Sequence, residues 1–338
     1  LIPAMGCTEP IAVAYAAAVA VQALGEKPES VEVNVSANII KNVKSVVVPC
    51  TGGLRGIGAA VCAGIVAGCP EKELEILEEI TGEQKVEMKK MLDTMPMTIR
   101  ESDKEYIFDI QIKACAGGHS GYVEIAGFHT NVICVKKDDE IIREKAYEEQ
   151  GSSCATDRSL LTVEKIIEFA DCVDVADVEE VLQRQIDYNW AIAEEGMTGN
   201  WGAAIGKTLM EAYGNSVHNR AKAMAAAGSD ARMNGCELPV VINSGSGNQG
   251  MTTSLPVIVY AKELNVSKEM MLRALVVSNL ITIHMKTGIG RLSAYCGAIS
   301  AGCGAGAGIC YLYGGRAYEI SHVIVNAVAI NSGVVCDG

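Results

Sequence analysis

The chain has 338 residues, a formal net charge of −13 and a composition that is 49% hydrophobic but only 5% aromatic. A chain of this length can bury a sizeable core and typically forms about two domains. Its negative charge and its lack of a basic cluster argue against nucleic-acid binding, because phosphate contacts need Lys and Arg side chains gathered on one surface.

The compartment is indicated by apolar runs and cysteines. No apolar run reaches the roughly 18 residues of a membrane span, and no secretory signal is visible. Thirteen cysteines without such a signal favour a reducing compartment. We therefore expect a cytoplasmic protein, bound to neither membrane nor nucleic acid, whose thiols serve as core packing, metal ligands or catalysts. Since the chain begins at Leu1 and not at a methionine, we also expect a fragment.

The first predicted element is an Ala-rich helix. Thr8 is its predicted N-cap, Pro10 occupies the first helical position and Gly25 ends it. A β-rich region follows, in which alternating or β-branched runs predict strands at 31–35, 43–48, 106–114 and 122–136, with helices at 58–67 and 72–92.

After Gly151 the pattern is helical to the end of the chain. The first helix has no helical partner in the β-rich stretch, so we expect it to pack on the C-terminal helices. The predicted fold is α+β: a predominantly helical domain, 1–26 plus 150–338, with an inserted α/β subdomain, 27–149. Crowding of small residues also predicts a helix-mediated homodimer.

Three motifs imitate functional sites. The segment 51–58 lacks the third glycine and the following acidic residue of a dinucleotide-binding turn, and 206–208 follows a helix where a phosphate-binding loop follows a strand. We interpret both as structural. His119 and His129 would form a zinc pair only with a third ligand nearby, so ordinary hydrogen bonding is the favoured interpretation.

A polar, glycine-rich loop at 245–253 follows an apolar run and precedes a predicted helix. Its backbone N–H groups, together with the side chains of Ser246, Asn248 and Gln249, favour an anion such as a carboxylate. The loop by itself leaves a flexible turn as an equal alternative.

Cys296, Cys303 and Cys310 follow one another at steps of seven residues on one predicted glycine-rich helix. Successive thiols at this spacing lie about 10 Å apart along a helix, so the three cannot bind one ion together. A metal site that uses one of them needs partners from elsewhere in the chain. Cys336 is the natural candidate, because it ends an apolar run just before Asp337.

Several motifs together resemble those of the L-cysteine desulfidases, which are related to the iron–sulfur L-serine dehydratase alpha chain. The motifs are Ala-Met-Gly-Cys-Thr-Glu-Pro at 4–10, the polar loop at 244–256, Gly-Arg-Leu-Ser-Ala-Tyr-Cys-Gly at 290–297 and Ser-Gly-Val-Val-Cys-Asp-Gly at 332–338. They appear in the family's order. The resemblance implies a lyase that works without pyridoxal phosphate (PLP) and makes the helical domain the catalytic one.

The resemblance also implies a cofactor and roles for three cysteines. In this family an oxygen-labile 4Fe-4S cluster is held by three cysteines, and its fourth iron is open to the substrate. By motif, Cys296 and Cys336 match the first two ligands, and the third is expected beyond Gly338. Cys7 resembles the family's proposed base, and the start of a helix would stabilise its thiolate. A structural cysteine is the alternative.

The implied reaction is elimination of hydrogen sulfide from L-cysteine to give pyruvate and ammonia. Cys7 would take the α-proton, the open iron would polarise the leaving group, and the polar loop with Lys286 or Arg291 would hold the carboxylate. An L-serine ammonia-lyase would share every part, although the 4–10 motif favours the desulfidase. The alternative from another class is a non-catalytic metal-binding protein. The catalytic interpretation requires Cys7, Cys296 and Cys336 to converge on one pocket.

Overall fold

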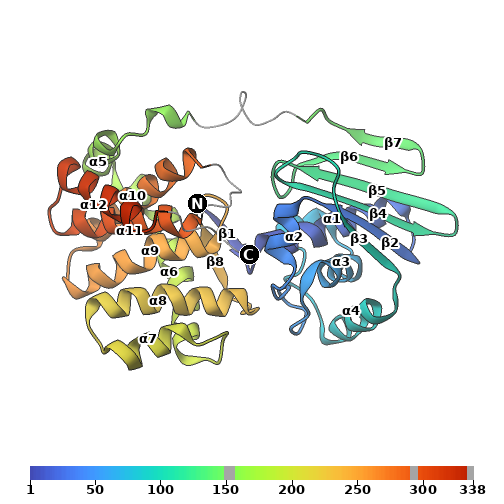
Figure 1. Ribbon diagram of the computed structural model, residues 1–338, viewed down its shortest axis with the longest axis horizontal. Helices are drawn as coiled ribbons and strands as arrows, with labels where there is room; N and C mark the ends of the chain where they lie inside the picture. The colour runs from blue at the N-terminus through green and yellow to red at the C-terminus, as the bar shows by residue number, and fades with distance from the viewer. Residues whose placement is uncertain (148–156, 290–295, 333–338) are drawn as a thin grey trace. The chain divides into compact units, whose positions relative to one another are not determined.

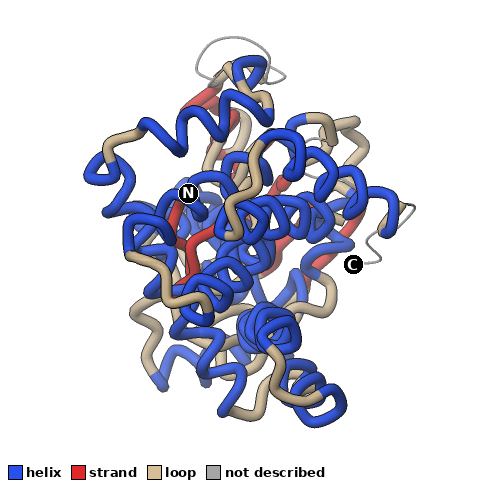
Figure 2. The backbone as a smooth tube through the Cα atoms, turned by 90° about the vertical axis from the view of Figure 1, so that its left-hand side faces the viewer, coloured by secondary structure: helices blue, strands red, loops and turns tan. Residues whose placement is uncertain are grey.

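The computed structural model describes residues 1–147, 157–289 and 296–332. The chain forms two compact units, which we call the helical unit (Leu1–Gly6 and Thr156–Asp337) and the α/β unit (Cys7–Ala155). Figure 1 shows helices throughout the first and a sheet with helices in the second. The predicted α+β class with a helical majority is confirmed, and the helix-rich course of the chain is also visible in Figure 2.

The α/β unit is built on a six-stranded sheet of order β3-β2-β4-β5-β6-β7. Strands β2 and β3 are parallel, and the other neighbouring pairs are antiparallel. The strands are β2 (Ser30–Val35), β3 (Met97–Glu101), β4 (Asp109–Ala116), β5 (His119–Ala126), β6 (Val132–Lys137) and β7 (Glu140–Glu144).

Helices cover one face of this sheet (Figure 1). They are α1 (Thr8–Leu24), α2 (Ala37–Val43), α3 (Gly56–Ala67) and α4 (Gly82–Thr94), with a short 3₁₀ helix η1 (Pro70–Glu75). The predicted strand at 43–48 is wrong. Val43 is the last residue of α2, and the residues after it form a turn and irregular chain, although the valines are buried. Burial alone therefore explains their composition.

The first helix, α1, packs between the sheet and α3 within the α/β unit, which corrects the expectation that it joins the C-terminal helices. Its backbone approaches both neighbours closely. A Cβ at Gly121 of β5 would lie 2.1 Å from the carbonyl oxygen of Ala20, and one at Gly64 of α3 would lie 1.9 Å from that of Ala14. Because α1 is apolar on nearly all sides, two apolar partners bury more of it than one.

The other face of the sheet is polar and contains a buried carboxylate. Asp109 of β4 is fully buried, and its Oδ2 accepts hydrogen bonds from Ser102 and Gln111. Its Oδ1 has no partner among the residues that the structure describes. Burial is the main cause that raises the pKa of the Asp109 carboxyl, with a further contribution from the nearby Glu124.

The helical unit contains eight described α-helices and one two-stranded sheet. The strands, β1 (Ile2–Met5) and β8 (Pro239–Ile242), are antiparallel. A short 3₁₀ helix, η2 (Arg158–Leu160), precedes the α-helices. These are α5 (Val163–Cys172), α6 (Val175–Thr198), α7 (Ile205–Tyr213), α8 (Val217–Met233), α9 (Gly247–Glu263), α10 (Lys268–Thr287), α11 (Gly297–Leu312) and α12 (Ala317–Ile330). None of the described helices is long and apolar enough to cross a membrane.

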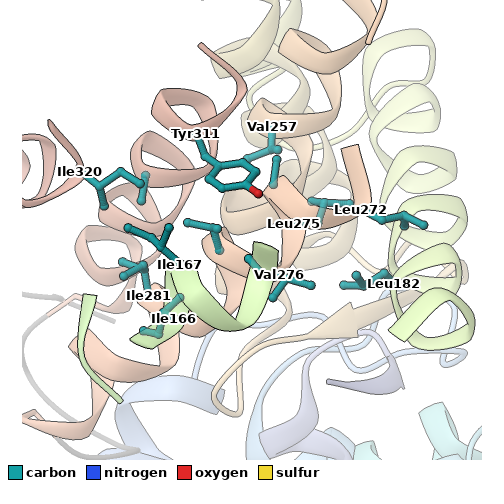
Figure 3. Close-up of a cluster of buried hydrophobic side chains, with 14 of the residues drawn as sticks. Ile166, Ile167, Leu182, Val257, Leu272, Leu275, Val276, Ile281, Tyr311 and Ile320 are labelled. Atoms are coloured by element: carbon teal, nitrogen blue, oxygen red, sulfur yellow. The ribbon is translucent and has the colours of Figure 1, made fainter. Parts of the chain in front are cut away.

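The core of the helical unit is apolar and includes residues of α10 and α11. Figure 3 shows Leu275 and Ile281 of α10 grouped with Tyr311 of α11 and with side chains of neighbouring helices. The two helices approach so closely that a Cβ at Gly304 would lie 2.0 Å from Oγ1 of Thr282. The glycines of α11 thus permit close helix packing.

Candidate functional site

The polar loop predicted from sequence is a defined turn between β8 and α9. The backbones of Asn243 and Ser246 exchange two hydrogen bonds of 3.1 Å, and the residues between them, Ser244 and Gly245, have φ of 51° and 85°. Positive φ at both central residues is characteristic of a type I′ turn. Ser246 is then the N-cap of α9, accepting a hydrogen bond from the backbone N–H of Gln249.

Buried amide side chains fix the base of this loop. Nδ2 of Asn243 donates to Oδ1 of Asn279 on α10 at 2.9 Å, and Asn279 in turn exchanges two hydrogen bonds with Gln185 on α6. Asn189 on α6 accepts from the backbone N–H of Val241 on β8 at 2.8 Å. Three elements therefore hold the loop in one position.

Gln249 is buried, at 7% exposure, but is only partly satisfied. Its Oε1 has no hydrogen-bond partner among the described residues. The side chain lies against the first residue of α11, since a Cβ at Gly297 would be 2.3 Å from its Nε2. Cys296 immediately precedes Gly297, so the structure brings Gln249 to the beginning of the helix that carries one predicted cluster ligand. An unsatisfied buried acceptor costs about 1–3 kcal/mol, which a ligand N–H group would recover.

A buried arginine that sequence reasoning missed also contacts the loop. Arg232 on α8 is 3% exposed. Its Nε donates to the carbonyl oxygen of Gly6 at 2.9 Å, and its Nη1 donates to Oδ1 of Asn248 at 3.1 Å. No carboxylate of the described residues forms an ion pair with it. Arg232 is one of two arginines in an Ala-rich helix, and the sequence does not reveal which of them is buried.

Only one of the two basic residues predicted to assist the loop lies in the described part of the chain. Lys286 is buried in the last turn of α10. Arg291 lies outside the described residues, and so does the predicted cluster ligand Cys336. The expected convergence of Cys7, Cys296 and Cys336 therefore stays a prediction.

Cys7 occupies the N-cap of α1, one residue before the predicted position of the cap. The helix thus begins at Thr8, and Pro10 is its third residue. Cys7 is 5% exposed as a residue, and its thiol donates to Oε2 of Glu9 at 3.2 Å. The same carboxylate accepts hydrogen bonds from Oγ1 of Thr8 and from Nδ2 of Asn42. Sequence reasoning missed Glu9, which gives the thiol a proton acceptor inside the α/β unit.

The cysteines of α11 differ in their suitability for a metal. Cys296 is the N-cap of the helix, is half-buried, and its side chain makes no capping hydrogen bond. A helix N-terminus is a favourable place for an anionic ligand sulfur. Cys303 is fully buried in the core, and burial raises the pKa of its thiol. Cys303 is therefore a packing residue, and the ligand role of Cys296 stays a prediction.

No three or more His, Cys, Asp and Glu side chains gather into a metal site within the described parts of the chain. The two histidines considered for zinc are engaged separately. His119 pairs with Asp138 at 3.0 Å, and His129 lies edge-on to the ring of Phe108. The structure therefore places the two histidines in different surroundings.

Comparison with known proteins assigns the family. Residues 71–338 match the family model described as the serine dehydratase alpha chain. The chain belongs to this family, as its motifs indicated, and it is similar over its whole length to several UPF0597 proteins. That of Desulfitobacterium hafniense is 58% identical, with 79% of the relative covered. Those of Lachnoclostridium phytofermentans and Treponema denticola are 50% and 43% identical, with 81% and 80% covered.

Proposed function

We propose that this protein is a PLP-independent carbon–sulfur lyase, an L-cysteine desulfidase, that converts L-cysteine to pyruvate, ammonia and hydrogen sulfide. The observation that carries the proposal is the buried, unsatisfied oxygen of Gln249 beside the start of α11. An acceptor in this position suits the ammonium group of an amino acid. Membership of the serine dehydratase alpha chain family supports the reaction class.

The 246–249 loop would hold the two charged groups of the substrate. The N–H groups of Gly247 and Asn248 open α9 and have no acceptor within the helix, so they suit the α-carboxylate. Oε1 of Gln249 would accept from the α-ammonium. Because a small amino acid offers both groups a few ångströms apart, one loop can orient the Cα–H and Cα–Cβ bonds.

Cys7 and Glu9 would carry the proton transfer. Glu9 accepts a hydrogen bond from the Cys7 thiol, so it can take the thiol proton and leave a thiolate. The thiolate then removes the α-proton, the electron pair of the Cα–H bond forms the Cα–Cβ double bond, and the bond from Cβ to the leaving group breaks. The resulting aminoacrylate tautomerises to an imine and is hydrolysed to pyruvate and ammonia.

The proposed cofactor is a 4Fe-4S cluster held by Cys296, Cys336 and a third cysteine after the Cys-Asp-Gly motif. When bound, an open iron would act as a Lewis acid on the leaving group. The half-buried thiol of Cys296 at the N-terminus of α11 fits a ligand role. We also propose that the helical unit holds the cluster and the substrate loop. The protein is further proposed to be a cytoplasmic homodimer, and light scattering tests the dimer directly.

L-Serine is the second candidate substrate, and the name of the matched family favours it. The two reactions share the carboxylate, the ammonium and the base, and differ only in the leaving group. A non-catalytic metal-binding protein is the candidate from another class, and turnover of either substrate excludes it.

The decisive experiment is anaerobic cluster reconstitution followed by assays of pyruvate and sulfide with L-cysteine and with L-serine. We expect sulfide from L-cysteine in a stoichiometric ratio to pyruvate. Gln249→Leu should raise KM for the substrate by about tenfold or more, because a charge-assisted hydrogen bond is lost. Gln183→Leu is the matched control, since Gln183 bonds only Asp187 on the outside of α6. A reconstituted, folded protein that turns over neither amino acid would contradict the proposal.

A further inference from the structure

We propose that Arg232 binds the α-carboxylate of the substrate, a role that the sequence had given to Lys286 or Arg291. The inference rests on the proposed function, because it names a residue of the same site. Its starting point is the burial of Arg232, which is 3% exposed as a residue and has no carboxylate partner among the described residues. Buried charges in proteins are normally paired.

The hydrogen bonds of Arg232 leave part of the guanidinium available. A guanidinium has five N–H donors. Nε donates to the oxygen of Gly6 and Nη1 to that of Asn248, with a longer contact from Nη1 to the sulfur of Met233 at 3.8 Å. Nη2 has no hydrogen bond to any described residue. These contacts fix the plane of the group and leave one of its nitrogens for an anion.

The loop backbone lies directly on this group. A Cβ at Gly247 would be 2.4 Å from Nε of Arg232, so only glycine permits the approach. The free N–H groups at the start of α9 and the guanidinium are thus presented together. A carboxylate has two oxygens in one plane, and this combination of an arginine with backbone N–H groups at a helix N-terminus matches it.

Arg232 also anchors the residue that follows β1, through its hydrogen bond to the carbonyl oxygen of Gly6. A merely structural arginine would make this bond as well, so the test has to separate a structural role from carboxylate binding.

L-Alanine and L-alaninamide provide that separation. L-Alanine has no leaving group and therefore binds without reacting, and L-alaninamide is the same ligand without a carboxylate. We expect calorimetry on the reconstituted protein to show that Arg232→Met weakens L-alanine binding by about 10- to 100-fold while L-alaninamide binding stays within about twofold. Arg220→Met is the control, because Arg220 lies on the same helix, pairs with Glu263 and should leave both affinities unchanged.

An equal loss of affinity for both ligands in Arg232→Met would overturn the inference, because it would show a structural role. If Arg232→Met does not fold by circular dichroism, Arg232→Lys decides. Weaker L-alanine binding at an unchanged melting temperature supports the inference, and unchanged binding refutes it. Turnover of L-cysteine by the wild type is scored separately. If the wild type turns over L-cysteine and both Arg232 variants bind L-alanine as the wild type does, only this inference is refuted. If binding depends on Arg232 but no turnover occurs, only the proposed reaction is refuted.

Discussion

Gly297→Ala should disable the proposed substrate site without unfolding the protein. The added Cβ would lie 2.3 Å from Nε2, 2.4 Å from Cδ and 2.9 Å from Oε1 of Gln249. Normal contact is about 3.5 Å, so the amide has to move by about 1 Å. Gln249 can make this movement by changing side-chain rotamer, and alanine is a better helix residue than glycine by about 0.5–1 kcal/mol. The net change in unfolding free energy should therefore be small.

The loss of function should be large by comparison, because a displacement of about 1 Å in a positioning group can reduce the rate about 100-fold. We expect kcat/KM to fall by about that factor while the melting temperature changes by only a few degrees. Gly302→Ala is the control on the same helix. A Cβ at Gly302 meets no atom within 4 Å, so this variant should keep its activity and gain a little stability. Equal activity in the two variants would refute the assignment of Gln249 to the site.

Three further predictions concern the packing and ionisation of other residues. Gly304→Ala places a Cβ 2.0 Å from Oγ1 of Thr282 between α10 and α11, and urea unfolding should show a loss of about 3 kcal/mol or more; a smaller loss would mean that the helices can separate. Asp109→Asn should raise stability at pH 7. Because the folded-state pKa of Asp109 is raised, its ionisation increasingly destabilises the fold as pH rises from about 4 through that pKa. The stabilities of the variant and the wild type should therefore converge below about pH 4. A stability gain of the variant that persists below this pH would contradict the explanation. Cys303→Ser should lower the free energy of unfolding by about 1–3 kcal/mol and leave the iron content of the reconstituted protein unchanged. Cys296→Ser should lower the iron content. The reverse pattern would contradict both assignments.

The helical course after residue 156 could be predicted because local signals repeat along it. Ser267 caps α10 and Thr162 caps α5 through their side chains, and both precede regular apolar spacing. The loop before α9 was also accessible, because β8, a turn and a helix follow one another within a short stretch. What sequence left open was whether this loop is rigid, and the pairing of Asn243 with Asn279 across 36 positions decides that.

The position of α1 could not be predicted, for a physical reason. An amphipathic helix indicates which face is buried, but α1 is apolar nearly all round and indicates none. Its partners are set by Gly64 and Gly121, where missing side chains allow close backbone approach. A glycine in a sequence does not indicate which distant carbonyl it accommodates. Arg232 was missed for the same reason, since its burial depends on Gly6 and Asn248 from distant parts of the chain.

The hydrogen bonding of the loop itself argues that Gln249 is a binding residue and not a packing defect. Beneath the loop, the amides of Asn189, Asn243 and Asn279 are buried and have partners. Leaving one of them unsatisfied would cost about 1–3 kcal/mol, so the sequence has matched each amide with partners on several elements. Gln249 is buried to a similar degree at the end of the same loop, yet its oxygen has no partner among the described residues. Because the neighbouring buried amides are all hydrogen-bonded, the unsatisfied oxygen of Gln249 marks the place where a ligand completes the network.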